Sequence, residues 1–378
     1  MIDYEALRII WWLLLGALLI GFALTDGFDL GVGTIFRFVG RGDAERRALL
    51  ESVEPVWEGN QVWFILGGGA VFAAWPLLYA ASFSSLYLAM FLVLIALILR
   101  PVGFSFRNRI ADARWRNLWD WALFAGGAVP ALLFGVAFGN LFLGVGFHFD
   151  ALMRPMYTSD FPHLLQPFAL LAGLVSLAML TLHGASYAAV KVGDPMAARA
   201  SAAGRLAAIA FVILFIAAGA WVAFGIDGQR ITGGADPLAP SDPLAKVVTV
   251  ARGAWLGNYR AHALLWLVPA AAVVAAAAAG ALLRARRAAA AFVCSAVTQA
   301  ATILTAGIAL YPFLMPSSTH PDQGLTIWDA SSSAKTLLIM LVAVIVFLPI
   351  VLAYTAWVFR VLRGRITLES LTTHGGPY

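Results

Sequence analysis

Long apolar segments recur along almost the whole chain, and they constrain its fold more than any other feature. Each is close to the length of about 20 helical residues that crosses a hydrocarbon core about 30 Å thick. With 61% apolar and only 12% charged residues, the 378-residue chain does not have the composition of a soluble protein. We therefore predict one all-α domain over residues 1–378, a polytopic integral membrane protein. Its nine transmembrane helices are expected at 9–38, 61–80, 83–106, 117–143, 163–191, 202–226, 262–283, 288–313 and 333–361.

Basic residues mark one side of the membrane. They follow every odd-numbered predicted span, whereas the even-numbered connections carry few of them or, like 227–261, are long. Because short cytoplasmic connections are enriched in Lys and Arg, the N-terminus is predicted to be periplasmic and the C-terminus cytoplasmic. Nucleic-acid binding is not predicted, because the arginines are not interleaved with aromatic residues in one patch. The residues that set the orientation are Arg37, Arg41, Arg46, Arg47, Arg107, Arg109, Arg114, Arg116, Lys191, Arg199, Arg284, Arg286, Arg287, Arg360, Arg363 and Arg365.

A weak internal similarity suggests two related halves. Aligning Asp26-Gly27 in the first span with His183-Gly184 in the fifth places a polar residue and a glycine at the same depth. If the similarity reflects a repeat, residues 1–143 form a first four-helix bundle and residues 163–313 a second. The ninth helix, 333–361, would then lie at the side, and 227–261 would be a long periplasmic loop.

Polar side chains interrupt the first three predicted spans at one end. The stretch LTDGFDLGVG places Asp26 and Asp29 three residues apart, and hence on one helix face. The predicted orientation brings acids, amides and an arginine from all three spans to the cytoplasmic boundary. A charge at mid-membrane costs about 2.5–3.5 kcal/mol to insert, so we expect these groups to pair or to be hydrated. The set consists of Asp26, Asp29, Glu58 and Arg100, with Asn60 and Gln61 beside Glu58.

Two compatible interpretations of this polar set stay open. In the first, Asp29, Glu58 and Arg100 form a structural ion-pair cluster that locks the first three helices together. In the second, the set is a hydrated proton-entry path in which Arg100 keeps one carboxylate ionised. Neither interpretation makes any residue of this chain catalytic. The residues expected to wall the cluster or to permit close helix packing are Trp57, Trp63, Asn60, Gln61, Gly27 and Gly31.

Metal-ligating residues are sparse. His183 is the only histidine well inside a predicted span, and a haem held by two axial residues would need a second His or Met at matching depth. We interpret His183 chiefly as a hydrogen-bonding residue in helix packing and keep it as a weak candidate ligand. The single cysteine, Cys294, excludes an intramolecular disulfide and any site built from several cysteines. No metal site is therefore predicted on this chain.

Spaced motifs along nearly the whole chain resemble subunit II of the cytochrome bd quinol oxidases. Glu58 occupies a position where that family often has aspartate, so the acid is kept. The motifs are RIIWWLLLGALLIGFALTDGFDLGVG, PVWEGNQVWF, FAAWPLLYAASFSSLYLAM, ILRPVGFSFR, RWRNLWDWALF, GVAFGN and the pair PFLMPSST and LTIWDASSS.

The resemblance implies a role that the residues alone do not. The chain would form a heterodimer with a haem-bearing subunit I in the bacterial inner membrane. The complex would oxidise quinol near the outer face, reduce O2 to water with cytoplasmic protons, and so generate a proton-motive force. Two haems b and one haem d are expected on the partner subunit and none on this chain. Small single-helix subunits and lipid are further expected partners.

A transporter is the competing hypothesis. A proton-coupled secondary transporter could use the same acids for coupling, with the two predicted bundles as its halves. A transporter would work without a haem-bearing partner and would show no visible absorption. Within the oxidase hypothesis, the connector 311–333 is interpreted as a rigid link, with contact to a partner or a quinol head group as the alternative.

Overall fold

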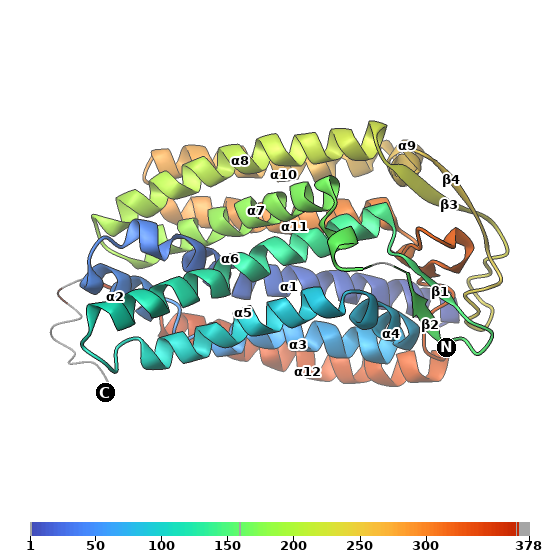
Figure 1. Ribbon diagram of the computed structural model, residues 1–378, viewed down its shortest axis with the longest axis horizontal. Helices are drawn as coiled ribbons and strands as arrows, with labels where there is room; N and C mark the ends of the chain where they lie inside the picture. Colours follow the sequence, from blue (N-terminus) through green and yellow to red (C-terminus); the bar gives the residue numbers. More distant parts are fainter. Residues whose placement is uncertain (1, 159, 368, 370–378) are drawn as a thin grey trace.

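Long helices lie side by side along the longest axis of the molecule (Figure 1). The structure is a computed structural model that describes residues 2–158, 160–367 and 369. Within these residues, eight helices are long and apolar enough to span a membrane, and helix makes up 73% of the chain. This confirms the prediction of an all-α polytopic membrane protein. The helices are α1 (Tyr4–Val39), α2 (Asp43–Glu51), α3 (Trp57–Ala74), α4 (Pro76–Ser85), α5 (Tyr87–Phe106), α6 (Ala113–Leu143), α7 (Pro167–Lys191), α8 (Met196–Phe224), α9 (Gly257–Ala261), α10 (Leu267–Arg284), α11 (Ala288–Leu310) and α12 (Ala334–Val361).

The second predicted span differs from the structure. One helix was expected over 61–80, but α3 ends at Ala74 and α4 begins at Pro76. Pro76 has no N–H to donate to the preceding turn, and it forces Trp75 out of the helical conformation, to φ −137° and ψ 75°. The 18-residue α3 starts with polar residues, and it is not among the eight span candidates found in the described chain. It packs against α1 and α12 and runs in the same direction as the long helices (Figure 1).

Helix α1 lies at the centre of the packing. It contacts α3, α6, α7 and α11, while α7 also contacts α6 and α8, and α10 packs against α8 and α11. The largest apolar cluster follows these contacts and includes Phe28, Leu30 and Val32 of α1 with Leu182 of α7. Because α1 and α6 pack directly on α7, the two sets of helices share one continuous core. The division into two four-helix bundles stays a prediction.

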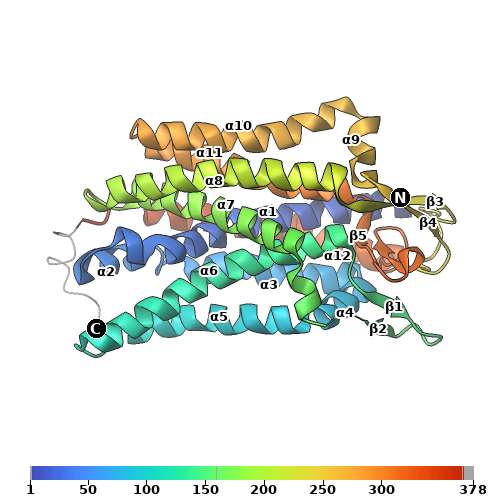
Figure 2. The ribbon, with the colours of Figure 1, turned by 45° about the horizontal axis from the view of Figure 1, so that its top comes forward.

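Short strands and loops gather at the end of the molecule that carries the N-terminus, opposite the C-terminal end (Figures 1 and 2). Each of three antiparallel pairs joins neighbouring strands of the sequence. The predicted long loop 227–261 contains one such pair and α9. The strands are β1 (Phe147–Phe149), β2 (Pro155–Tyr157), β3 (Asp227–Gly233), β4 (Val247–Arg252), β5 (Phe313–Met315) and β6 (Leu325–Thr326).

Buried charges tie these loops to α1. The guanidinium of Arg8 is fully buried and donates hydrogen bonds to the carbonyl oxygens of Pro237, at 2.6 Å, and Ala239, at 3.1 Å. Nearby, Lys246 Nζ lies 2.9 Å from Asp329 Oδ2, and both side chains are buried. Unpaired buried charges are costly, so these contacts hold the 227–261 loop and the 311–333 connector firmly against the helices. The order of the connector agrees with the rigid-link interpretation.

Candidate functional site

A buried ion pair joins α5 to α1. Arg100 Nη1 donates to Asp26 Oδ2 at 3.0 Å, and Arg100 Nη2 donates to Asp26 Oδ1 at 2.7 Å. Both side chains are almost inaccessible to solvent. The planar guanidinium matches the two carboxylate oxygens, which makes such a bidentate pair strong and directional. The pair therefore fixes the position of α5 relative to α1.

Asp29 lies one helical turn further along α1 and is held differently. Its Oδ2 accepts a hydrogen bond from Asn60 Nδ2 of α3 at 2.8 Å and lies 3.8 Å from Arg100 Nη2. Its Oδ1 is buried and accepts no hydrogen bond from any residue that the structure describes. An ionised carboxylate offers about four acceptor positions. Asp29 therefore keeps free capacity to bind a proton or a water molecule, whereas Asp26 is committed to Arg100.

The local sequence explains how the cluster is built. Asp26 and Asp29 share one face of α1 because they are three residues apart. Arg100 precedes Pro101, which lies inside α5 and cannot donate a backbone hydrogen bond. The guanidinium carbon of Arg100 is also 5.9 Å from the centre of the Trp57 ring, within the range of a cation–π interaction. Trp57 thus borders the cluster at Arg100.

Glu58 does not join the cluster, which corrects the sequence prediction. Its side chain is exposed, and no hydrogen bond or ion pair links it to another described residue. In a helix, residues two positions apart point in nearly opposite directions, at about 200°. Because Asn60 faces α1, Glu58 must face away from α1. The partly buried Gln61 makes no side-chain hydrogen bond within the described chain, and Trp63 packs against Gly21 of α1 instead of the acids.

Glycines bring α1 and α7 into backbone contact beside the cluster. A Cβ atom added at Gly31 would overlap the carbonyl oxygen of Leu180 and lie 2.8 Å from Gly184 Cα. A Cβ atom added at Gly27 would lie 2.9 Å from Leu180 Cδ2 and 3.2 Å from Gln299 Oε1. Real Cβ atoms essentially never come within 3.0 Å of another atom, so an alanine at either position would force its neighbours to move. Gly27 and Gly31 therefore serve helix packing, a role in which small residues are enriched in membranes.

His183 has no free ring nitrogen for a metal. Its Nδ1 lies 2.7 Å from Ser295 Oγ, and its Nε2 lies 3.1 Å from the carbonyl oxygen of Leu24. The fully buried ring also stacks on Phe292, with ring centres 4.6 Å apart. These contacts connect α7 to α1 and α11. His183 does not fit the role of a haem ligand, and it acts as a hydrogen-bonding residue in helix packing.

A further buried acid, Asp120, was not predicted from the sequence. Asp120 of α6 accepts from Arg107 Nε at 2.6 Å and from Arg46 Nη1 at 2.7 Å, and it lies 3.9 Å from Arg37. Arg107 also pairs with Asp43 at 2.9 Å. These contacts tie α1, α2, α5 and α6 together at the C-terminal end. The sequence signal for it is a single aspartate in the apolar stretch NLWDWALF, and its partners are among the arginines that mark the cytoplasmic side in the predicted orientation.

An apolar cavity of about 340 Å³ lies among α1, α6, α7, α8, α10 and α11. Its walls are mostly aromatic and aliphatic, including Phe22, Phe134 and Phe168. Among the described residues that line it, Tyr259 is the one titratable side chain, and its hydroxyl donates to the Thr305 carbonyl oxygen. The cavity can accept apolar groups, but its walls offer no chain of acids. The buried carboxylates lie instead in the neighbouring charged cluster.

The fold and the cluster define a polytopic membrane protein with a group of charged residues buried between its helices. The chain matches the family described as cytochrome bd terminal oxidase subunit II over residues 7–362. It is 51% identical over 371 residues to the cytochrome bd-I ubiquinol oxidase subunit 2 of Escherichia coli (strain K12), with 98% of each chain covered. It is 49% identical over 366 residues to the probable cytochrome oxidase subunit 2 of Haemophilus influenzae, with 97% of each covered. The chain belongs to the cytochrome bd terminal oxidase subunit II family.

A solved structure supports the fold. The bd oxidase from Geobacillus thermodenitrificans matches with a TM-score of 0.65 and 17% identity, over 94% of this chain and 98% of the other. Family membership confirms the multi-pass location in the bacterial inner membrane and favours the oxidase hypothesis over the transporter. It also implies that the chain works with a partner subunit in a haem-containing oxidase.

Proposed function

We propose that the chain is a subunit of a quinol-oxidising, O2-reducing terminal oxidase. Within that complex, this chain is the subunit that does not ligate haem. The observation that carries this proposal is the 51% identity, over 98% of the chain, to a protein named as subunit 2 of a ubiquinol oxidase. Its partner would be a subunit I that holds two haems b and one haem d. The committed hydrogen bonds of His183 agree with haem ligation elsewhere. Haem would supply the electron transfer, while this chain would supply structure and a proton route.

Purification tests this proposal directly. An affinity tag on this chain, expressed with its native neighbours, should recover a second large membrane subunit with absorption bands of haems b and d. The recovered complex should consume O2 when quinol is added. Small single-helix subunits should appear in the same preparation if they belong to the complex. A colourless chain that purifies alone and moves a solute across vesicle membranes would overturn the proposal in favour of a transporter.

We further propose that the charged cluster divides two tasks between its acids. The bidentate pair of Asp26 and Arg100 holds α1 against α5 and serves a structural task. Asp29, with its free Oδ1 and its partner Asn60, is the group that takes up a proton. Glu58 lies exposed in the first turn of α3, two residues before Asn60, where it can act as the outer acid. This end of the helices is proposed to face the cytoplasm, the side from which the complex would take the protons for O2 reduction.

Replacing Asp29 with asparagine should slow quinol-dependent O2 uptake while the complex still assembles. The substitution preserves shape and leaves the pair of Asp26 and Arg100 in place, but it removes the proton carrier. We expect a loss of about a hundredfold, the lower end of the range for removing a positioned acid–base group. The measurements are O2 uptake per haem and the yield of assembled complex. Glu51→Gln, which removes one carboxylate from the surface helix α2, is the matched control and should change neither. If the yield of assembled complex falls by the same factor as the total O2 uptake, Asp29 has a structural role instead.

A further inference from the structure

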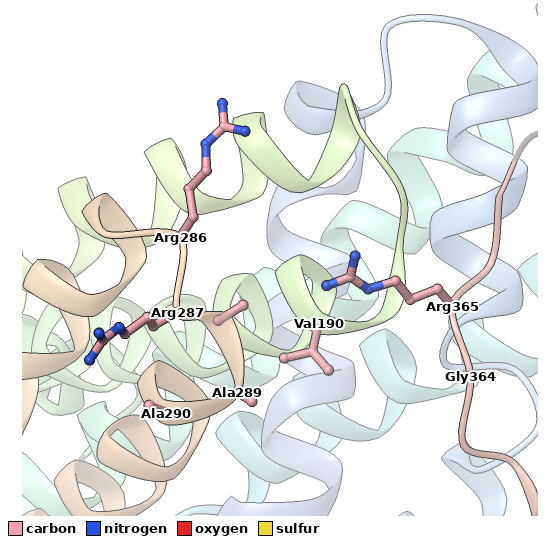
Figure 3. A pocket seen from close by; sticks show the side chains of 8 residues that line it. Val190, Arg286, Arg287, Ala289, Ala290, Gly364 and Arg365 are labelled. Atoms are coloured by element: carbon pink, nitrogen blue, oxygen red, sulfur yellow. The ribbon is translucent and has the colours of Figure 1, made fainter.

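A basic pocket opens at the C-terminal end of the helices, apart from the acid cluster. It has a volume of about 580 Å³ and lies where the turn between α10 and α11 meets the end of α7 and the segment after α12 (Figure 3). We call it the arginine pocket. Its lining residues are Val190, Arg286, Arg287, Ala288, Ala289, Ala290, Gly364 and Arg365.

The arginines come from two distant parts of the chain. In Figure 3, Arg365 extends toward Val190, whereas Arg286 and Arg287 extend outward from the turn. Arg286 has a positive φ of 58°, which is uncommon for a residue other than glycine, and the side chains of Arg286 and Arg287 leave this strained turn in different directions (Figure 3). Within the described chain, the nearest acid partner is Asp194, 3.8 Å from Arg286, and no carboxylate pairs with Arg287 or Arg365. The pocket therefore carries a net positive charge.

The backbone adds to this charge. Helix α11 begins at Ala288, and no side chain caps its first turn. The first amide groups of a helix have no carbonyl partner within the helix, and they carry the positive end of its dipole. Ala288, Ala289 and Ala290, which bear these amides, also line the pocket. An anion in the pocket would meet both guanidinium groups and unpaired N–H groups.

An apolar stripe leads away from the pocket. Ala289, Val293 and Val297 follow one another at intervals of four residues, and therefore lie on one face of α11. The side chains of Val293 and Val297 are exposed, by 62% and 45%. Because α11 is a membrane span, this stripe faces lipid unless another protein covers it. The pocket thus has a cationic head and an apolar continuation, as an amphiphile would require.

We propose that the arginine pocket binds an anionic phospholipid of the leaflet at the C-terminal end. The phosphate group would sit among Arg287, Arg365 and the first amides of α11, and one acyl chain would lie along Val293 and Val297. Arginine pairs well with phosphate, because its planar group offers parallel donors. A free phosphate ion shares the head-group chemistry but makes no use of the stripe.

The test uses the complete complex with its partner subunit in nanodiscs. The discs contain phosphatidylcholine with or without phosphatidylglycerol, and native mass spectrometry counts the lipids retained after mild delipidation. The wild-type complex should retain phosphatidylglycerol in preference to phosphatidylcholine. The Arg287→Gln/Arg365→Gln variant should lose this retention by about tenfold or more, since each basic residue near an anionic surface contributes about 1 kcal/mol.

The matched control is Arg109→Gln/Arg114→Gln, which removes two exposed arginines at the same end, one from the α5–α6 connection and one from the first turn of α6. It should retain phosphatidylglycerol as the wild type does. Equal retention by wild type and the pocket variant, or an equal loss in the control, would overturn the proposal. Displacement of the lipid by millimolar inorganic phosphate would assign the pocket to a free anion and also overturn it. If the double variant fails to assemble, Arg287→Gln and Arg365→Gln are measured singly by the same criterion.

Discussion

Arg100→Gln is expected to destabilise the protein by about 3–5 kcal/mol, enough to reduce sharply the amount of assembled complex. Arg100 is buried and is the cationic partner of two buried carboxylates. Its Nη2 atom lies 2.7 Å from Asp26 Oδ1 and 3.8 Å from Asp29 Oδ2. Without it, Asp26 loses both strong hydrogen bonds and becomes a buried carboxylate without a cationic partner. A lone buried charge is far more costly than a neutral residue in the same place.

The order of effects within the cluster separates charge from packing. Asp26→Asn should be milder than Arg100→Gln, because Asp29 stays close enough to neutralise Arg100. The double variant Asp26→Asn/Arg100→Gln should recover part of the loss, since it also removes the carboxylate that Arg100→Gln leaves without a partner. The stabilities of the three variants are ranked by the yield of assembled complex and by the half-life of its haem absorption at a fixed raised temperature. Arg47→Gln, which breaks an exposed pair with Glu51 worth about 0.3–0.5 kcal/mol, is the control. If both single variants and the double variant are equally unstable, packing dominates over charge.

Much of the cluster could be predicted because its rules are local. The three-residue spacing of Asp26 and Asp29 requires a shared helix face, and hydropathy with basic residues brings Arg100 to the same end of the helices. The rotation of α3 about its own axis is not local, since packing against α1 decides it. Asn60 therefore reached Asp29, while Glu58, two positions away, turned outward.

Two other differences have separate causes. The sequence AAWPLL contained the break between α3 and α4, because Pro76 cannot continue the preceding helix. The mean hydropathy stays high across this break, since every residue around it is apolar, so hydropathy alone predicts one continuous helix. Asp120 was missed because the sequence does not show which residues are its partners. Its arginine partners Arg46 and Arg107 lie in segments that hydropathy treats as surface, and only the folded packing shows that they turn inward to meet it.

Gly31→Ala is expected to disrupt the contact between α1 and α7 and to lower stability by about 3 kcal/mol, the upper range for adding a methyl group to a tightly packed core. Both neighbours of the new Cβ atom are backbone groups, the Leu180 carbonyl oxygen and Gly184. Neither can rotate out of the way as a side chain would, so the helices must separate. Separation would also lengthen the 3.1 Å contact between His183 Nε2 and the Leu24 carbonyl oxygen.

Gly16→Ala is the matched control on the same helix, because a Cβ atom there meets no atom within 4 Å. Alanine loses less conformational freedom than glycine in a helix, so this variant should be unchanged or slightly more stable. The measurement is the half-life of the haem absorption of the detergent-solubilised complex at a fixed raised temperature, together with its yield. A shortened half-life for Gly31→Ala alone would show that the two backbones touch in the assembled oxidase. Equal half-lives for the two variants would mean that α1 and α7 lie farther apart there, and that the acid cluster is not positioned by this contact.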